Sequence, residues 1–553
     1  MKKILLIVFV LLFQISFSKP ITEVEKLAAT CKVWGFLKYY HPNVADGSKN
    51  WDEQLFQILP QIEKVQTTEE FSKVIEKWIN SLGEIKSYKA VKSVKYRDYF
   101  DKNFDLSWIS NNEIFSKDLS KKLKFIENNR IQTKQFYIEF TEDDEKGVFE
   151  EITNEISYPD FVWTNKNLRI LTLFRYWNYV EYFFPYKYQT DQHWDKTLTE
   201  MLPKFINTES EVDFHMAMKE LIVKLGDSHA FFGTRVLYLY FFGDKFVPFE
   251  TKIIDDKAIV ISLKNDSLSK LNDIRIADVI TKVDGREIAE ILKEKIKYIE
   301  GSNTSTVLRN SNTAIFNGKS KNAEIEYIRD GKTAVKSINR YIYLDMKVKS
   351  VSVNKEKWKI LEDNIGYVNF TSLMHNDIPA LIENLKDTKA LIFDNRCYPN
   401  GIMSTIANWI NSESKDFARF TYPDITYPGK FYWSKNFDIG SENPNHYKGK
   451  VIVLVDENTQ SHAEFTAMSL KTAPDVTIIG SQTAGADGNV CNFQIIKGFY
   501  TSFSGLGVFY PNKKETQRIG IVPDIEVKPT ISGIQQGRDE ILERAVLFVK
   551  NGK

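Results

Sequence analysis

The chain has 553 residues, a length typical of three or four domains rather than one. Apolar residues make up 42% of the sequence and charged residues 27%, as in soluble globular proteins. The net charge of +1 provides no overall field that would recruit nucleic acid or an anionic membrane, so neither is expected as a partner. Three cysteines, Cys31, Cys397 and Cys491, argue against a disulfide scaffold. No Cys/His cluster has metal-ligand spacing, so the sequence predicts no metal and no organic cofactor.

Residues 1–18 have the features of a secretory signal peptide. Lys2 and Lys3 precede an apolar run from Ile4 to Ile15, and Ser16 and Ser18 are small residues at the positions that a signal peptidase reads. The run is too short to span a bilayer comfortably. We therefore expect cleavage after Ser18, export to the periplasm or the cell exterior, and no stable membrane insertion of the mature chain.

An internal repeat follows, and its two copies align without a gap. Both copies share a pair of tryptophans, two prolines and a final Leu-Gly, and the matching residues are Trp34, Pro42, Trp51, Pro60, Leu82 and Gly83, then Trp177, Pro185, Trp194, Pro203, Leu225 and Gly226. Aromatic and aliphatic residues recur at helical spacing, and glycine is a natural helix terminator. The sequence therefore predicts a duplicated helical module over residues 19–87 and 161–240.

The two copies differ where they end. The first copy ends in Glu84-Ile85-Lys86, whereas the second ends in Asp227-Ser228-His229. Only the second copy carries a Ser-His pair just past its last helix, although a lone histidine there could also serve loop packing or capping. Residues 88–160, between the copies, are charged and aromatic with weak strand patterns such as QFYIEF, and the sequence assigns them no role.

Residues 245–345 change to short alternating strands. The strand KAIVISL is followed by a strand that ends in an Asp284-Gly285 turn, and a second Asp-Gly turn at Asp330-Gly331 predicts a hairpin. This pattern resembles a PDZ domain as found in processing peptidases, with Ala277 where such domains have glycine. PDZ domains bind a peptide terminus as an added strand. The alternative is an unrelated small β domain.

Residues 355–553 read as an α/β unit in which the apolar strands ALIFDNRC, KVIVLVD and VTIIG alternate with helices. Ser461 lies at a strand-to-helix turn, at the first position of a helix. The unpaired N–H groups and the positive dipole end of a helix N-terminus favour a developing oxyanion there. The alternative is structural, because Ser461 and Glu464 also have the spacing of a capping box.

The order of four motifs, DNRCYPNG, VDENTQSHAEFTAMSLK, IIGSQTAG and GIVPDIEVKPT, resembles the tricorn and C-terminal processing peptidase family. The resemblance covers most of the mature chain and implies a ClpP/crotonase-like peptidase core with Ser461 as nucleophile. One branch of the family takes its base from a lysine in the loop after the third strand, where this chain has Ala486. The tricorn-like branch uses a Ser-His pair, and its resemblance implies His229 as general base, oriented by Ser228.

The resemblance also implies an oxyanion hole made by the backbone N–H groups of His462 and of Gly401 or Asn400. The family has Gly-Gly where this chain has Asn400-Gly401, so Asn400 is expected to tolerate the φ of a glycine. The acidic fourth member of the tricorn-like site corresponds to Gln517. A neutral amide can orient Ser228 by hydrogen bonding but cannot stabilise positive charge on the base.

Together these observations predict a multidomain α+β protein with a duplicated N-terminal helical module, a PDZ-like β domain and a C-terminal α/β peptidase core. The expected activity is hydrolysis of peptide bonds in peptides or unfolded proteins through a Ser461 acyl-enzyme. The alternative is a catalytically impaired peptide-binding or ligand-carrier protein on the same fold, which the departures at Asn400 and Gln517 favour. The sequence predicts no particular oligomeric state.

Overall fold

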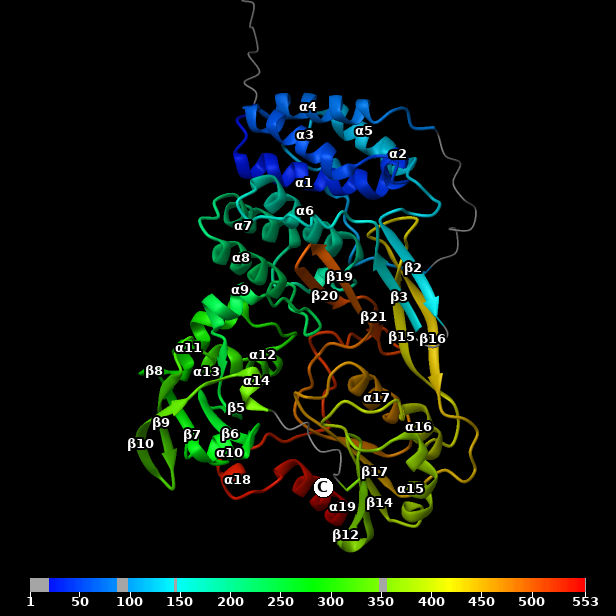
Figure 1. The fold of residues 1–553 in the computed structure, drawn as a ribbon. Coiled ribbons are helices and arrows are strands. Elements are labelled where there is room, and N and C mark those ends of the chain that lie inside the picture. Colours follow the sequence, from blue (N-terminus) through cyan, green and yellow to red (C-terminus); the bar gives the residue numbers. More distant parts are fainter. Residues whose placement is uncertain (1–18, 87–97, 144–146, 348–355, 553) are drawn as a thin grey trace, which may run out of the picture. The chain divides into compact units, whose positions relative to one another are not determined.

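The computed structural model describes residues 19–86, 98–143, 147–347 and 356–552, and the expected signal peptide lies outside these ranges. The chain divides into two compact units (Figure 1). The first holds the described residues before position 87 together with residues 105–131. The second holds residues 98–104 and the described residues from 132 onward.

The first unit is helical. Its helices are α1 (Glu23–Tyr40), α2 (Pro42–Ala45), α3 (Trp51–Lys64), α4 (Thr68–Ser81) and α5 (Lys117–Asn128). Two buried tryptophans join α1 to α3, because each indole Nε1–H donates to the other's carbonyl oxygen: Trp34 to Trp51 at 3.3 Å and Trp51 to Trp34 at 3.0 Å. The aromatic pattern of the first copy therefore corresponds to helix packing.

The second copy, in the second unit, has the same internal arrangement. Its helices are α6 (Lys166–Phe183), α7 (Trp194–Ile206) and α8 (Glu211–Val223). Trp177 and Trp194 exchange the same reciprocal hydrogen bonds, at 3.1 and 3.0 Å. The glycine that was expected to terminate the last helix has a positive φ in both copies, 99° at Gly83 and 62° at Gly226, which is a conformation that favours glycine.

Residues 245–345 form a sheet with the order β10-β9-β7-β6-β5, to which β8 adds by pairing with β7. Its elements are β5 (Phe249–Ile254), β6 (Lys257–Leu263), α10 (Asp266–Leu271), β7 (Val279–Val283), β8 (Arg286–Glu287), α11 (Ile288–Lys295), α12 (Thr304–Asn310), α13 (Asn312–Phe316), β9 (Asn322–Arg329) and β10 (Lys332–Asn339). Both Asp-Gly turns are tight, with positive φ at Asp284-Gly285 and at Asp330-Gly331. The predicted hairpin at Asp330-Gly331 is confirmed by the pairing of β9 with β10, and the predicted Asp284-Gly285 turn directly follows β7.

Ala277 has a left-handed backbone with φ of 75°, at the position where the resemblance expects glycine. A Cβ in that conformation costs about 1–2 kcal/mol, and the entropy of a more flexible unfolded chain offsets part of the gain from removing it. We therefore expect Ala277→Gly to raise the free energy of unfolding by up to about 1 kcal/mol in urea denaturation. Ala258→Gly, in the buried middle of the sheet, is the matched control and should lower it. An equal loss at both positions would contradict the strain at Ala277.

The C-terminal part of the second unit is built on a six-stranded sheet. In sheet order its strands are β12 (Trp358–Leu361), β13 (Ile365–Asn369), β14 (Ala390–Asp394), β17 (Lys450–Val455), β18 (Val476–Gly480) and β22 (Ile525–Glu526). The strands from β13 to β22 are parallel, and β12 is antiparallel at the edge. Loops that follow β14, β17 and β18 therefore meet at one edge of the sheet, where open α/β sheets bind their ligands.

Helices cover both faces of this sheet, which explains why its strands are almost continuously apolar. On one face, side chains such as Phe393 and Val453 pack with helices α15 (Ile378–Leu385), α16 (Met403–Ile410) and α17 (His462–Leu470). On the other face, side chains such as Ile392 and Ile452 pack with α19 (Glu540–Asn551). The predicted α/β architecture of residues 355–553 is thus present, and the mixed α+β class of the whole chain is confirmed.

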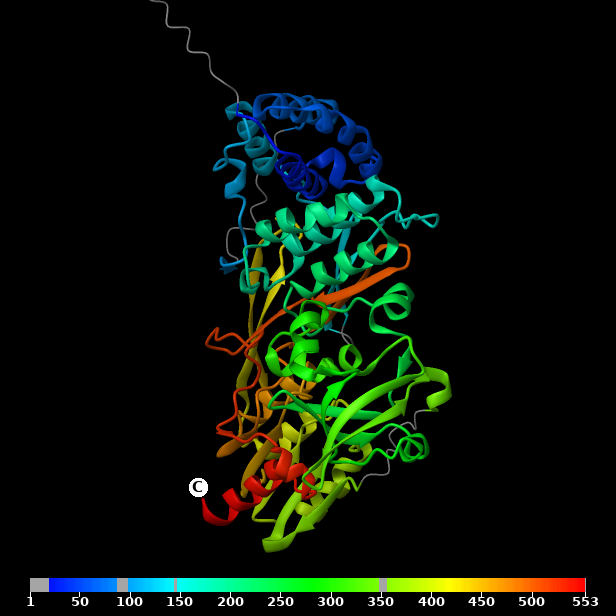
Figure 2. The same cartoon turned by 90° about the vertical axis from the view of Figure 1, so that its left-hand side faces the viewer.

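Two further antiparallel elements belong to the second unit. The first is a sheet with the order β1-β16-β15-β21, made of β1 (Tyr99–Phe100), β15 (Lys415–Pro423), β16 (Phe431–Ile439) and β21 (Gly507–Phe509). The second is the hairpin of β19 (Val490–Ile496) and β20 (Phe499–Ser504), which packs against α6 of the helical module (Figures 1 and 2). A bridge between Phe231 and Ser502 joins this hairpin to the chain just after α8.

The segment between the two helical copies contributes to both units. Its first strand, β1, pairs with β16, and α5 belongs to the first unit. A further hairpin joins β2 (Ile138–Asp143) to β3 (Gly147–Ile152), in the region where the pattern QFYIEF gave a weak strand signal.

Candidate active site

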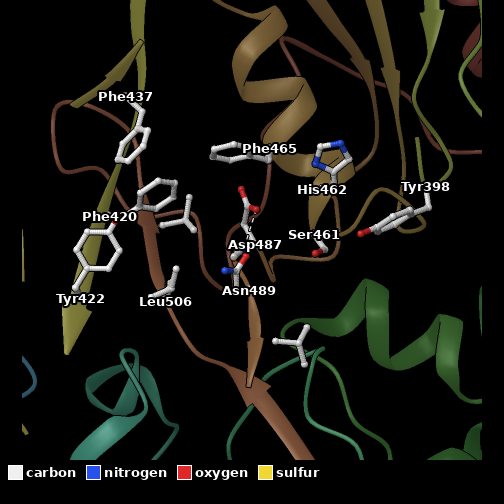
Figure 3. A pocket seen from close by; sticks show the side chains of 13 residues that line it. Tyr398, Phe420, Tyr422, Phe437, Ser461, His462, Phe465, Asp487, Asn489 and Leu506 are labelled. Atoms are coloured by element: carbon white, nitrogen blue, oxygen red, sulfur yellow. Dashed lines mark hydrogen bonds between the residues drawn. The ribbon is translucent and has the colours of Figure 1, made fainter. Parts of the chain in front are cut away.

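Ser461 lies between the end of β17 and the start of α17, as the sequence predicts, and its backbone is strained. Its φ of 57° and ψ of −124° are unusual for a residue with a Cβ. Its N–H donates to the Ala486 carbonyl oxygen at 2.9 Å. The side chain lies in the wall of a cavity, beside Asp487 and Asn489 (Figure 3). Backbone strain of this kind is concentrated at functional sites, where it presents a side chain in a fixed direction.

Glu464 holds the loop that faces Ser461. Its buried carboxylate accepts hydrogen bonds from the N–H groups of Gly485 at 2.8 Å and Ala486 at 3.0 Å, and from the Thr483 hydroxyl. It also accepts from the Ser461 N–H at 3.3 Å, which is Glu464's part of the predicted capping box. Burial raises the pKa of Glu464 in spite of these donors. Glu464 therefore does more than cap its helix, because it positions the 483–486 loop.

The lysine position of the Ser-Lys branch is occupied by a buried, small side chain. Ala486 has no exposed surface, and both its N–H and its carbonyl are used within the site, by Glu464 and Ser461 respectively. Lys471, at the end of α17, donates to the Val476 carbonyl oxygen and forms an ion pair with Asp524. The Lys471 side chain is thus engaged by Val476 and Asp524.

His229 lies in the loop after α8 and is oriented through Ser504. Its Nδ1 lies 2.9 Å from the Ser504 hydroxyl oxygen, and that hydroxyl donates to Asp227 Oδ1 at 2.9 Å. Since Ser504 has a single proton and gives it to the carboxylate, it can only accept from His229, so His229 carries its proton on Nδ1. The Nε2 atom is then the unprotonated nitrogen, as a general base requires.

Asp227 is the buried centre of this arrangement. Its carboxylate also accepts from the backbone N–H of Ser504 at 2.6 Å, from that of His229 at 3.1 Å and from the Gln517 side-chain amide at 3.2 Å. Burial lowers the pKa of His229, and the charge of Asp227 opposes that shift. The imidazole is therefore held neutral beside a carboxylate that favours its protonated form.

Two of the expected site residues make other contacts. Ser228 Oγ accepts from the Ser302 N–H at 2.8 Å and donates to the Ala484 carbonyl oxygen at 3.3 Å, so it ties the histidine loop to the 483–486 loop. Gln517 donates to Asp227 rather than to Ser228. Asp227 and Ser504 occupy the orienting positions that sequence reasoning gave to Ser228 and Gln517. Asp227 carried a possible signal, since it directly precedes the Ser-His pair, but nothing in the sequence singles out Ser504.

The loops that carry Ser461 and His229 are joined through their preceding residues. The Gln460 side-chain amide donates to the Ser228 carbonyl oxygen at 3.3 Å. Arg309, from α12, donates to the side chain of Gln460 at 2.7 Å and to the Glu457 carbonyl oxygen at 2.6 Å. Among the described residues, Ser461 and His229 share no direct hydrogen bond. Hydrogen bonds between catalytic groups commonly tighten only when substrate binds.

The expected oxyanion donors lie next to Ser461 or on the loop after β14. His462 is the first residue of α17, where backbone N–H groups have no helical partner. Gly401 has a φ of 68°, and a Cβ built on it would meet nothing within 4 Å. Asn400 is exposed and has no positive φ; its amide donates to the carbonyl oxygens of Thr371 and Leu373. The left-handed conformation is thus at Gly401, and the substitution at Asn400 carries no strain.

An ion-pair cluster anchors this loop. Arg396 binds Asp394 at the end of β14 at 2.7 Å and Asp539 before α19 at 2.7 Å. The Tyr367 hydroxyl also donates to Asp394, at 2.7 Å. These contacts fix the start of the loop that leads to Gly401, and they account for the Asp-x-Arg part of the motif. In the part of the chain that the structure describes, no group of His, Cys, Asp and Glu could hold a metal ion.

A strained serine between a parallel strand and a helix, and a histidine whose Nδ1 contacts a hydroxyl, both lie in the second unit. Residues 364–527 match the model of Peptidase family S41, and this segment of the chain is an S41 peptidase domain. The predicted resemblance to the C-terminal processing peptidases is confirmed at this level.

Two relatives illustrate the likeness. A carboxy-terminal-processing protease of Bartonella bacilliformis is 23% identical over 311 residues, which are 52% of this chain and 62% of that protein, so the match spans less than two thirds of that relative. The structure of mature CPAF complexed with lactacystin superimposes with a TM-score of 0.54 at 14% identity, over 71% of this chain and 99% of that one. The second likeness concerns the fold alone.

No helix in the described ranges is long and apolar enough to cross a membrane.

Proposed function

We propose that the chain is an exported serine peptidase in which Ser461 is the nucleophile and His229 is the general base. The observation that carries the proposal is the tautomer of His229, which Ser504 and Asp227 fix so that Nε2 is free to take a proton. The strained turn at Ser461 and the S41 match of residues 364–527 support it.

In this mechanism the Ser461 hydroxyl attacks the carbonyl carbon of a peptide bond while its proton moves to His229 Nε2. The negative charge that develops on the carbonyl oxygen is stabilised by the N–H groups of His462 and Gly401. The protonated His229 then gives its proton to the leaving amine, and an acyl-enzyme remains on Ser461. Water, activated by His229, hydrolyses the acyl-enzyme and restores the serine.

In each step the negative charge of Asp227 stabilises the positive charge that develops on His229. When His229 becomes positively charged, the carboxylate of Asp227 stabilises that charge through the Ser504 hydroxyl. Gln517 keeps the carboxylate in place by donating to it. A neutral Gln517 is compatible with catalysis in this arrangement, because the negative charge that the resemblance places there is supplied by Asp227. The amide at position 517 therefore does not by itself indicate a catalytically impaired protein.

The remaining parts of the proposal concern the rest of the chain. Residues 1–18 direct export, and the mature protein acts in the periplasm or outside the cell. The two sets of helices with reciprocal tryptophan bonds are a duplicated module, of which only the second copy contributes to the site. The sheet over residues 245–345 is a PDZ-like domain that binds an extended peptide segment as an added strand. The substrates are peptides or unfolded proteins.

A fluorophosphonate probe tests the proposal most directly. The purified mature protein should be labelled at Ser461, as located by mass spectrometry of the digested protein. Heat-denatured protein should remain unlabelled, because only the oriented His229 makes the hydroxyl reactive. Labelling at a different serine, or equal labelling of folded and denatured protein, would refute the assignment.

The hydrogen-bond chain from His229 through Ser504 to Asp227 makes a separate prediction, which compares Asp227→Asn with Ser228→Ala. An amide at position 227 can donate to Ser504, which would then donate to His229 and leave the proton on Nε2. We expect Asp227→Asn to lower kcat by about a thousandfold or more, and Ser228→Ala to lower it by less than about tenfold. Asp227→Asn should also move the acidic limb of the pH–rate profile to lower pH, because the charge that raises the pKa of His229 is gone. A larger loss of kcat in Ser228→Ala than in Asp227→Asn would instead identify Ser228 as the residue that orients His229.

A further inference from the structure

A cavity of about 510 Å³ opens directly beside Ser461 (Figure 3). Aromatic side chains form part of its walls, namely Tyr398, Phe420, Tyr422, Phe437 and Phe465. Its volume lies in the range of pockets that enclose a small ligand or a large side chain. Because Ser461 and His462 also line it, a side chain bound there would belong to a substrate residue next to the bond that is cleaved.

One buried acid interrupts the apolar lining. Asp487 is 2% exposed, and its Oδ1 accepts a hydrogen bond from the Gly488 N–H at 2.8 Å. Its other oxygen, Oδ2, is buried and has no hydrogen-bond partner among the described residues. An unsatisfied buried polar atom lowers the stability of a fold. It therefore requires an explanation, and a missing ligand atom is one.

The surroundings keep Asp487 uncharged. Burial raises its pKa well above the ordinary value, and the second buried acid, Glu464, raises it further. Neither acid has an ion pair with a lysine or arginine in the part of the chain that the structure describes. Both effects favour the protonated acid, in which Oδ1 accepts from Gly488 and Oδ2 carries the proton. A ligand atom that accepts a hydrogen bond would satisfy that O–H.

We infer that Asp487 is a specificity-determining residue and that the cavity receives a tyrosine side chain of the substrate, whose phenol oxygen hydrogen-bonds to Asp487 Oδ2. The inference deepens the proposed peptidase function and rests on it. The aromatic walls complement the ring, and aromatic pairs add to the energy of burial. A phenylalanine would fill the same space but would leave the acid without a partner.

A positively charged side chain fits less well. Lysine or arginine would require Asp487 to ionise inside an apolar cavity, beside the second acid. The cost of moving both charges out of water commonly equals or exceeds their attraction. The two occupants therefore differ in a measurable way, because the neutral acid selects the hydroxyl of tyrosine and the ionised acid selects a cation.

The experiment uses a set of peptides that are identical except for Tyr, Phe or Lys before the cleaved bond. For the wild-type protein we expect kcat/KM to be about ten- to a hundredfold higher for Tyr than for Phe, and lowest for Lys. Asp487→Leu should make Tyr and Phe equal, whereas Asp487→Asn, which keeps a donor, should retain part of the preference. Val490→Ala, which trims an apolar part of the lining, is the matched control and should leave the Tyr/Phe ratio unchanged.

A second measurement separates this inference from the proposed function. The affinities of the Ser461→Ala variant for the same peptides are measured by calorimetry, which requires no turnover. Tighter binding of the Tyr peptide supports the inference even if the wild-type protein cleaves nothing, a result that would refute only the peptidase proposal. Cleavage without a preference for Tyr over Phe, or a preference for Lys, would overturn the inference and leave the peptidase intact. If Asp487→Leu does not fold, the wild-type series and Asp487→Asn decide the question.

Discussion

Ser461→Ala is expected to lower kcat for peptide hydrolysis by about a millionfold and to abolish labelling by a fluorophosphonate. The variant removes the only atom that would bond covalently to substrate. What remains, the two backbone N–H donors and the binding surfaces, would support only a small residual rate. The measurement is single-turnover hydrolysis of an unfolded protein substrate together with mass spectrometry of the labelled protein.

The variant should remain folded, and this makes the test informative. The hydrogen bonds that fix the neighbouring loop converge on the carboxylate of Glu464, which the substitution leaves in place. Ser469→Ala is the matched control, because it removes a buried hydroxyl from the same helix, where Oγ only donates to the Thr466 carbonyl oxygen. We expect it to keep full activity. Comparable losses in the two variants, or activity in folded Ser461→Ala, would contradict the role of Ser461.

Local patterns in the sequence were sufficient to predict much of the fold. Ser461 was recognised at a strand-to-helix turn because the apolar run before it and the helical pattern after it are both long and regular. The strain at this residue was not predictable, since nothing in the neighbouring side chains dictates a positive φ. It arises from the tertiary contact in which the Ser461 N–H meets the carbonyl of Ala486.

The sequence did not predict Ser504 and Asp227 as the residues that orient His229. Ser504 is far from His229 along the chain, and it reaches the site because the β19–β20 hairpin packs against the second helical module. Asp227 was hidden for another reason. The first copy of the repeat has an acid, Glu84, at the corresponding position, so a comparison of the two copies does not single out Asp227.

Gln517 shows how a family pattern can mislead at a single position. The resemblance predicted an acid there and an interaction with Ser228, and the neutral side chain suggested impaired catalysis. In the structure the amide donates to Asp227, so a second carboxylate at position 517 would face the first. In this chain the carboxylate is therefore at position 227 and the amide at position 517. The proposed catalytic unit needs one negative charge behind the histidine, and it has one.

His229→Ala should lower kcat by about four to six orders of magnitude, because it removes the proposed base for the Ser461 hydroxyl. The corresponding change in the first repeat, Lys86→Ala, alters an exposed side chain and should be nearly silent. Equal effects at the two positions would mean that the two copies do not differ in function. Imidazole added to His229→Ala should restore part of the activity, whereas a variant that had merely lost its fold would not respond.

The pH dependence of the wild-type protein provides an independent check on His229. Burial lowers the pKa of the imidazole, so the neutral form that acts as base persists to lower pH than for an ordinary histidine. As the pH falls, kcat/KM should therefore stay constant through the usual histidine range and decline only below it. The same shift lowers the free energy of unfolding in acid. As the pH falls, His229 binds a proton in the unfolded chain before it does so in the folded protein, and this stabilises the unfolded state. An acidic limb at or above the ordinary pKa of histidine would show that the imidazole is not held neutral by burial, and the proposed base would then lose its physical support.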